Sequence, residues 1–147
     1  MSGIVCAVRG GPDSQPTILQ SIALAQETRQ TIYFLYVVNL DFLSHTATSR
    51  IHVVRQEMKE MGEFILLTAQ AQAIEQGLDA EIVVREGQVG KEIIALCLSV
   101  QADYVVLGRP RGQADANIFT HERLNQFAEH IQQESHAKVV LAKVTPK

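Results

Sequence analysis

The chain has 147 residues and a formal net charge of −3, and its 46% hydrophobic and 20% charged residues are ordinary values for one globular domain. The charge argues against nucleic acid as a partner, because domains that bind a phosphate backbone carry a basic face, and no apolar run approaches the roughly 20 residues that span a bilayer. Since the N-terminus also lacks the basic and apolar regions of a signal peptide, we expect a single domain over residues 1–147 that works in the cytoplasm without a membrane partner.

The first third of the chain predicts two strands joined by a helix. Residues 3–8 form an unbroken apolar run that stops at a Gly-Gly-Pro turn, which is typical of a strand buried on both faces. Asp13 or Ser14 can cap a helix that runs to about Thr28, and residues 31–38, rich in β-branched and aromatic side chains, predict the second strand. The apolar face predicted for this helix consists of Ile18, Leu19, Ile22, Ala23 and Ala25.

The middle of the chain predicts a long amphipathic helix, a strand and a shorter helix. The long helix covers residues 49–76, the third strand covers residues 80–85, and the shorter helix follows from Val89. We interpret Met58 and Met61 as residues that fill the core, and we leave the order of the loop at 42–48 open. The apolar positions of the long helix are Ile51, Val54, Met58, Met61, Ile65, Ala69 and Ala73, and those of the shorter helix are Val89, Ile93, Ile94, Leu96 and Cys97.

The last third of the chain predicts two strands and a helix. Residues 104–107 form a buried strand that stops at Gly108, and residues 139–144 form the last strand. Between them, the segment 109–119 is irregular, and Thr120 is a candidate N-cap. The helix that follows carries its apolar side chains at Leu124, Phe127, Ala128 and Ile131.

Strands that alternate with helices at this spacing predict βαβ units, whose crossovers are nearly always right-handed. We therefore expect an α/β fold with a five-stranded parallel sheet and helices on both faces. Open sheets of this kind bind ligands beyond the carboxyl ends of their strands, where the strand order reverses. The residues after the first, second and fourth strands are the ones that we expect to form a site.

Several stretches of the sequence, in this order, resemble the universal stress protein family. They are the first strand running into a Gly turn, the second strand ending in Val37-Val38 before a polar residue, the segment from Glu86 to Ile93 that opens a helix, and the segment from Ala102 to Gly108. The resemblance spans about 140 of the 147 residues. It implies a three-layer, adenine nucleotide alpha hydrolase-like fold with strand order 3-2-1-4-5, a role in the stress response, and a homodimer.

The resemblance also implies an ATP site, from which this sequence departs in three places. Family members place an Asp at the end of the first strand, where this chain has Arg9. Their Gly-x-x-Gly loop after the fourth strand is one residue longer here, Gly108-Arg-Pro-Arg-Gly112. Their second Gly-Ser/Thr is missing, since no Gly follows Gly112. We therefore expect ATP, AMP or a cyclic dinucleotide as candidate ligands rather than ATP alone.

The candidate nucleotide-binding residues follow from these strand ends. Arg9, Arg109 and Arg111 would converge on one crevice, and guanidinium groups suit phosphate oxygens. The alternative is that Arg109 and Arg111 are solvated loop charges and that Arg9 pairs with Asp13 or another acid. The full predicted set is Ala7, Val8, Arg9, Gly10, Val38, Leu107, Gly108, Arg109, Arg111 and Gly112.

The last strand is a candidate dimer interface, because it would lie at the sheet edge and is apolar. An apolar edge strand is an aggregation hazard unless it is covered or paired. In universal stress proteins this strand commonly pairs with its own copy, so the resemblance implies a homodimer. The residues predicted for this interface are Val139, Val140, Leu141 and Val144.

Catalytic and metal-binding residues are not predicted. The five histidines, at positions 45, 52, 121, 130 and 136, lack metal-ligand spacing, and Cys6 and Cys97 fit small core residues. No serine stands in a nucleophile elbow. The sequence therefore predicts a binding or regulatory module. Two alternatives stay open: an enzyme of the nucleotide-binding α/β group that transfers an adenylyl group or slowly hydrolyses ATP, and a dimeric scaffold without a ligand.

Overall fold

The structure is a computed structural model that describes residues 3–8, 14–40, 48–108 and 118–142. Within these ranges, strands and helices alternate along the chain, as the sequence pattern predicts. The elements are β1 (Gly3–Ala7), α1 (Ser14–Thr28), β2 (Thr31–Val38), α2 (Thr48–Glu75), β3 (Ala80–Glu86), α3 (Val89–Val100), β4 (Tyr104–Leu107), α4 (Ile118–Ser135) and β5 (Lys138–Leu141).

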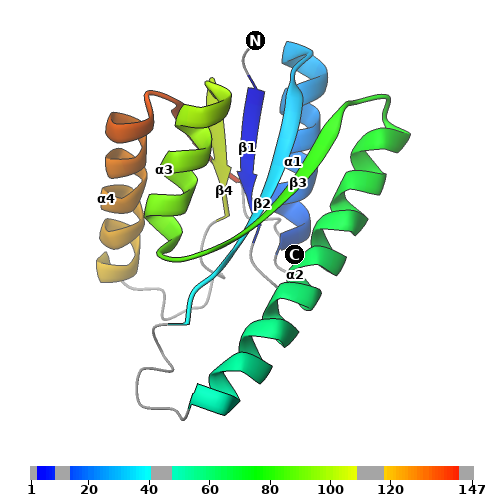
Figure 1. Cartoon of the computed structure of the whole chain (residues 1–147). Coiled ribbons are helices and arrows are strands. Elements are labelled where there is room, and N and C mark those ends of the chain that lie inside the picture. The colour runs from blue at the N-terminus through cyan, green and yellow to red at the C-terminus, as the bar shows by residue number, and fades with distance from the viewer. Residues whose placement is uncertain (1–2, 9–13, 41–47, 109–117, 143–147) are drawn as a thin grey trace.

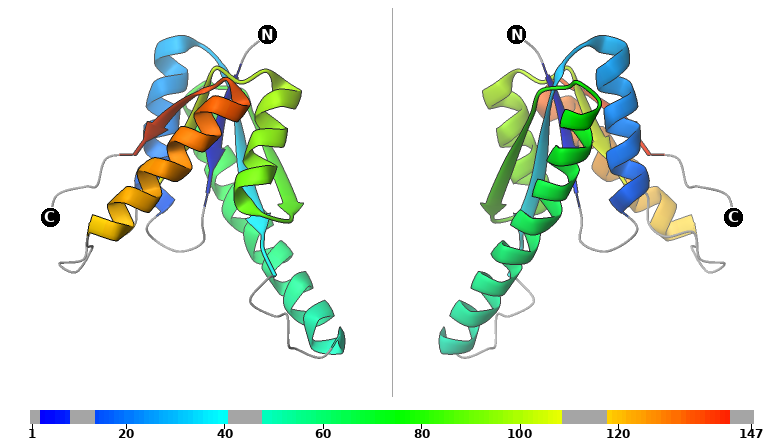
Figure 2. Two further views of the ribbon diagram at one scale, coloured as in Figure 1. Left: turned by 90° about the vertical axis from the view of Figure 1, so that its left-hand side faces the viewer. Right: turned by 90° about the vertical axis from the view of Figure 1, so that its right-hand side faces the viewer.

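The strands form one parallel sheet in the order β3-β2-β1-β4-β5. Helices α1 and α2 cover one face of the sheet, and α3 and α4 cover the other (Figures 1 and 2). The predicted strand order and three-layer architecture are therefore confirmed. None of the helices in the described ranges is long and apolar enough to cross a membrane. The cytoplasmic location stays a prediction.

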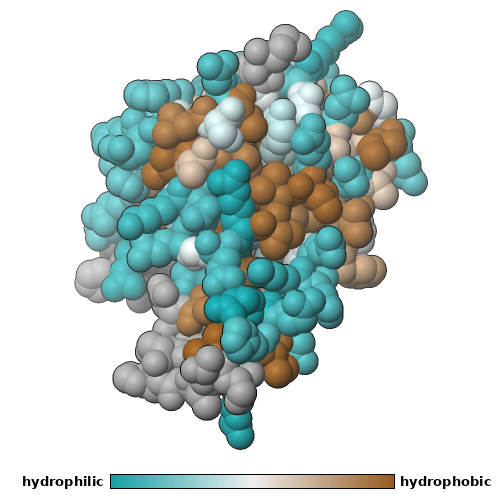
Figure 3. All heavy atoms as spheres, viewed as in Figure 1, coloured by the Kyte–Doolittle hydropathy of each residue, from teal (hydrophilic) through white to brown (hydrophobic). Residues whose placement is uncertain are grey.

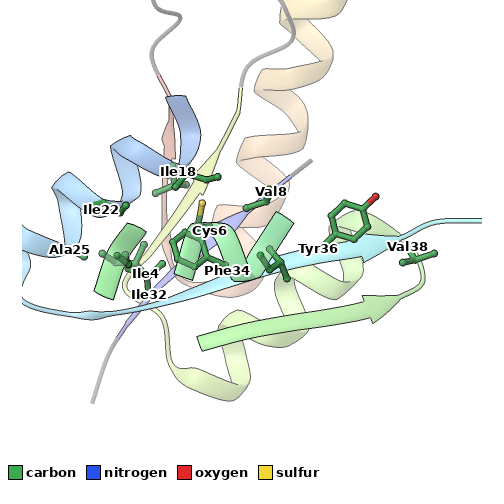
Figure 4. Packing of buried hydrophobic residues seen from close by; sticks show 14 residues of the cluster. Ile4, Cys6, Val8, Ile18, Ile22, Ala25, Ile32, Phe34, Tyr36 and Val38 are labelled. Atoms are coloured by element: carbon green, nitrogen blue, oxygen red, sulfur yellow. The ribbon is translucent and has the colours of Figure 1, made fainter. Parts of the chain in front are cut away.

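Two apolar layers, one on each face of the sheet, form the core. Ile4 and Cys6 of β1 pack toward α1 and α2, whereas Val5 packs toward α3 and α4, and all three are fully buried. Figure 4 shows the layer between β1, β2 and the first pair of helices, with Phe34 of β2 among its members. Because both faces are covered, the central strands carry apolar side chains without alternation.

Most predicted boundaries agree with the structure to within one or two residues, but one predicted cap is wrong. Helix α4 begins at Ile118, so Thr120 lies inside its first turn and is not the N-cap. A Thr marks a helix start only where the residues before it are not helical, and here the helix already includes two of them. The last strand ends at Leu141, and Val144 lies outside the described residues.

Four apolar side chains predicted to face the core are exposed instead: Leu19 and Ala23 on α1, Met61 on α2 and Val89 on α3. The interpretation of Met61 as core filling is therefore wrong, whereas Met58 is partly buried against the core. On α1 the buried face combines apolar side chains with hydroxyls, and the hydroxyl of Ser21 is satisfied by a hydrogen bond of 2.8 Å to the carbonyl of Ile18. That face is made of Ser14, Thr17, Ile18, Ser21, Ile22 and Ala25.

Helix α2 approaches β2 closely at Gly62, which is buried in the helix. A Cβ atom added there would lie 2.2 Å from Cδ2 of Tyr36. The ring of Tyr36 therefore occupies the space that any side chain at position 62 would need. This contact places α2 against the sheet beside the carboxyl end of β2.

We predict that Gly62→Ala destabilises the protein. Alanine favours helices by about 1 kcal/mol relative to glycine, but overpacking against Tyr36 costs about 1–3 kcal/mol. Chemical denaturation should therefore give a lower free energy of unfolding for Gly62→Ala. In a Tyr36→Leu background, which removes the ring, the same substitution should be neutral or stabilising. An equal loss in both backgrounds would show that the ring is not the cause.

Candidate functional site

The carboxyl ends of β1 and β4 lie side by side at the point where the strand order reverses. Ala7 of β1 is level with Leu107 of β4 on one side and with Leu35 of β2 on the other. From β1 the chain crosses over α1 to β2, and from β4 it crosses over α4 to β5 on the opposite side. In parallel sheets, connections that leave in opposite directions open a crevice at this point. The structure thus brings together the ends of β1 and β4, including Val8 and Gly108, which directly follow them.

Val38, a fifth predicted site residue, lies further along the sheet. Leu35 of β2 is the partner of Ala7, and Val38 lies three residues after Leu35. Three residues of a strand span about 10 Å. The side chain of Val38 is fully buried, and its carbonyl accepts a hydrogen bond of 3.0 Å from the N–H of Gly87. Val38 therefore lies beside the strand ends of β1 and β4 rather than between them.

The first turns of α1 bring buried hydroxyl groups to the same end of the sheet. Ser14 and Thr17 are both buried, and Ser21 donates a hydrogen bond of 2.8 Å to the carbonyl of Ile18. The thiol of Cys6 lies 3.9 Å from the Thr17 carbonyl, a weak sulfur hydrogen bond between β1 and α1. Thr17 was missed by the sequence analysis, although the spacing of positions 14, 17 and 21 on one helix face was a usable signal.

Gly108 lies against Thr17, and this contact explains why glycine ends β4. A Cβ added at Gly108 would lie 2.7 Å from Oγ1 of Thr17, which is shorter than real Cβ contacts. The missing side chain thus lets the end of β4 approach α1 closely. Gly108, which the sequence predicts as part of the nucleotide site, therefore also has a packing role.

The thiols inside the core are not available as nucleophiles. Burial raises the pKa of Cys6 to about 12, partly opposed by a hydrogen bond with Ser21. Burial likewise raises the pKa of Cys97 to about 12, partly opposed by Ser135. Both stay neutral near pH 7, and neutral buried thiols are unreactive. Their interpretation as core residues is confirmed. Among the residues that the structure describes, no three His, Cys, Asp or Glu side chains could jointly hold a metal ion.

Ion pairs gather at the carboxyl end of β3. Arg55 of α2 lies 2.9 Å from Glu86, and Lys59 lies 3.9 Å from the same carboxylate. On the opposite face of the sheet, Arg85 lies 3.7 Å from Glu92 of α3. These side chains are partly exposed, so each pair adds little stability. The single negative charge of Glu86 thus offsets one of the two positive charges that Arg55 and Lys59 bring to this end of β3.

Several predicted site residues lie outside the part of the chain that the structure describes. The convergence of the three arginines on the crevice therefore stays a prediction. So does the alternative that they are solvated or paired with Asp13. The residues concerned are Arg9, Gly10, Arg109, Arg111 and Gly112.

We predict that Gly108→Ala lowers stability through Thr17. The added methyl group would overpack the contact between β4 and α1, at a cost of about 1–3 kcal/mol. In a Thr17→Ala background the hydroxyl is gone, so the loss of unfolding free energy should be clearly smaller. A double-mutant cycle measured by chemical denaturation tests this coupling. Additive effects of the two substitutions would contradict the proposed contact.

No curated protein sequence matches this chain. Solved structures share its fold at low sequence identity. UspA from Lactobacillus plantarum is 13% identical with a TM-score of 0.75, and the alignment covers 97% of each chain. The universal stress protein from Archaeoglobus fulgidus in complex with dAMP is 18% identical with a TM-score of 0.62, covering 97% of this chain and 98% of that one.

A universal stress protein family protein from Arabidopsis thaliana with AMP bound is 17% identical with a TM-score of 0.62, covering 99% of this chain and 93% of that one. At such identities these similarities show the fold alone. The sequence model of the universal stress protein family is more specific, and it matches residues 1–143. Since this match spans nearly the whole chain and agrees with the strand order, the protein belongs to the universal stress protein family.

Proposed function

We propose that this universal stress protein binds an adenine nucleotide or a related phosphorylated ligand in the crevice between the ends of β1 and β4. The observation that carries the proposal is the reversal of strand order beside Ala7 and Leu107, which is where open parallel sheets bind ligands. Relatives from Archaeoglobus fulgidus and Arabidopsis thaliana, whose structures contain dAMP and AMP, support this ligand class. In this proposal the protein is a binding or regulatory module of the stress response.

The crevice offers backbone groups and helix ends rather than catalytic side chains. Helix α1 follows β1 and helix α4 follows β4, so the N-termini of both helices lie at the carboxyl end of the sheet (Figure 1). The unpaired N–H groups of a first helical turn attract anions such as phosphate. Within the described residues, α1 places the buried hydroxyls of Ser14 and Thr17 at this end of the sheet, and no described base is hydrogen-bonded to a nucleophile there. This composition supports binding over hydrolysis.

Arg9 changes which part of a nucleotide the site would recognise. Family members have an Asp at this position, and a carboxylate can accept hydrogen bonds from ribose hydroxyls. A guanidinium donates only, and it pairs well with phosphate oxygens. We therefore propose that the ligand is held mainly through phosphate, which widens the candidates from ATP to AMP and cyclic dinucleotides.

A thermal-shift titration of nucleotide-stripped protein tests this function. At a hundred times its dissociation constant a ligand that binds only the folded state adds about 2.7 kcal/mol of stability. We expect such a shift with at least one of ATP, AMP and a cyclic dinucleotide. Arg9→Gln should reduce the shift, whereas Lys138→Gln, at the opposite end of the sheet, should leave it unchanged.

Other outcomes would favour the alternatives. No shift with any nucleotide would contradict ligand binding and favour a scaffold. Release of phosphate or of AMP from ATP, at a rate that Arg9→Gln abolishes, would favour an enzyme. An equal shift in both variants would mean that the ligand binds elsewhere on the molecule.

We also propose that β5 takes part in a homodimer, as the family resemblance implies. Strand β5 is a sheet edge, and its side chains Val139, Val140 and Leu141 are only partly buried. One feature opposes simple strand pairing here, because the N–H of Val139 donates a hydrogen bond of 3.1 Å to Oε1 of Gln132. A dimer through β5 would have to displace Gln132 or pair beyond it.

The expected solution mass, measured by sedimentation at micromolar concentration, is at least that of two chains. Leu141→Lys should weaken this dimer, because it places two like charges in an interface formed by two copies of one strand. Gln132→Ala should leave the dimer intact or strengthen it, since the freed N–H becomes available for pairing. A mass of one chain for the unmodified protein would contradict the proposal.

A further inference from the structure

Strand β3 forms the second edge of the sheet. The backbone N–H and C=O groups of its successive residues point alternately toward β2 and toward the edge that has no neighbouring strand. The carbonyl of Asp79 accepts a 3.1 Å hydrogen bond from Ile32, and the N–H of Gly87 donates one of 3.0 Å to Val38. Since the N–H and C=O of one residue point to the same side of a strand, and sides alternate along it, the odd-numbered residues face β2. Ile82 and Val84 therefore direct their N–H and C=O groups toward the open edge.

The side chains of β3 are self-complementary about Val83. Val83 packs toward α3 and α4, while Ile82 and Val84 pack toward α1 and α2. Because side chains alternate along a strand, Glu81 and Arg85 project to the same face as Val83. If a second copy lies antiparallel with a two-fold axis at Val83, Glu81 falls opposite the partner's Arg85. Ile82 then falls opposite the partner's Val84.

Apolar side chains of α2 flank this edge. The amide of Gln70 donates a hydrogen bond of 2.8 Å to the carbonyl of Ala80, so this side of α2 faces β3. Leu67 and Ile74 lie three residues before and four residues after Gln70, hence on the same side, and they are 49% and 56% exposed. Figure 3 shows hydrophobic surface gathered over β3 and the neighbouring turns of α2. Contiguous apolar surface beside an open edge is a typical protein-contact feature.

We propose that the β3 edge is an interface between two copies of this chain, paired antiparallel about Val83. Each Ile82 would exchange two backbone hydrogen bonds with the partner's Val84, because their groups point outward. The pairing would end at Ala80, whose carbonyl Gln70 already occupies.

The charges of β3 favour antiparallel over parallel pairing of two β3 edges. Parallel alignment in register would place Glu81 opposite its own copy, and like charges directly opposite are destabilising. Antiparallel alignment instead forms two Glu81–Arg85 pairs. Within the chain, Arg85 lies a loose 3.7 Å from Glu92, and its side chain is 34% exposed, so it is accessible to a second carboxylate. The β5 edge, Lys138–Leu141, carries no acidic residue and has no such complementarity.

Cross-linking through an introduced thiol tests the register directly. In the proposed pair the two Val83 residues form a non-hydrogen-bonded pair, whose Cα atoms lie about 4.5 Å apart, within the range of about 4.4–6.8 Å that a disulfide spans. Val83→Cys should therefore form a covalent dimer under mild oxidation at micromolar concentration. Ile82→Cys is the matched control, because residue 82 faces residue 84 of the partner rather than its own copy. The native thiols are fully buried and should not contribute.

We expect the covalent dimer to form at least roughly tenfold faster with Val83→Cys than with Ile82→Cys. The reason is that residue 83 lies directly opposite its own copy, whereas residue 82 lies opposite residue 84 of the partner. No covalent dimer with Val83→Cys, or equal rates for the two variants, would overturn the proposal. A dimer formed only through β5 would leave position 83 at the opposite edge of the sheet and give no cross-link. The experiment therefore tests the β3 interface independently of the β5 interface.

Charge reversal provides a second measurement. Glu81→Arg and Arg85→Glu each place like charges opposite one another, and each should weaken self-association through this edge roughly tenfold. An equal mixture of the two variants restores both ion pairs and should form a mixed dimer in preference to either self-dimer. Glu134→Arg, the same charge change on an exposed site of α4, should have no effect. A mixture that associates no better than the single variants would contradict the proposal.

Discussion

The burial of β1 on both faces is the constraint on which the rest of the structure depends. Ile4, Val5 and Cys6 are fully buried between two pairs of helices, so this central strand has no exposed face. A strand in this position contributes no charged or hydrogen-bonding side chain along its length without a desolvation cost. Polar chemistry is thereby confined to the strand ends, where the chain leaves the sheet. The location of the candidate site follows from this burial.

Close approach of helices to the sheet depends on positions that lack a side chain or have a small one. Gly62 allows α2 to rest on Tyr36, and Gly108 allows the end of β4 to rest on Thr17. Both contacts lie toward the carboxyl end of the sheet, where the candidate site is. Glycine at position 108 thus serves packing whether or not a ligand binds. Its presence in a loop that resembles a phosphate-binding motif is weaker support for phosphate binding than the sequence alone suggests.

At both sheet edges a glutamine side chain occupies a backbone group of the edge strand, but the two strands are covered to different extents. A glutamine from a neighbouring helix bonds to an outward backbone group of each edge strand, Gln70 to Ala80 on β3 and Gln132 to Val139 on β5. Edge strands with open backbone groups invite pairing with other chains. The capped group of β3 lies at the first residue of a seven-residue strand, whereas that of β5 is the second of four. More of β3 is therefore left for pairing.

The order of strands and helices, their approximate bounds and the family could be read from the sequence. Unbroken runs of apolar and β-branched residues indicate strands that are buried on both faces, and apolar residues at helical spacing indicate helices that are buried on one side. The strand ends followed from these runs, which is why the sequence placed Ala7 and Leu107 at the ends of neighbouring strands. The contact of Gly108 with Thr17 was not found, because it joins residues that only the fold brings together.

The sequence by itself thus determined the architecture and the end of the sheet where a ligand would bind, since hydrophobic periodicity is a local property of the chain. Only the tertiary structure decided which faces of the helices were truly buried. It exposed Leu19 and Met61 while burying the hydroxyls of α1, because the position of a residue around its helix decides whether the side chain faces the sheet or the solvent. It also decided which edge of the sheet is capped and where, because a glutamine on a helix surface gains a partner only when a strand edge lies beside it.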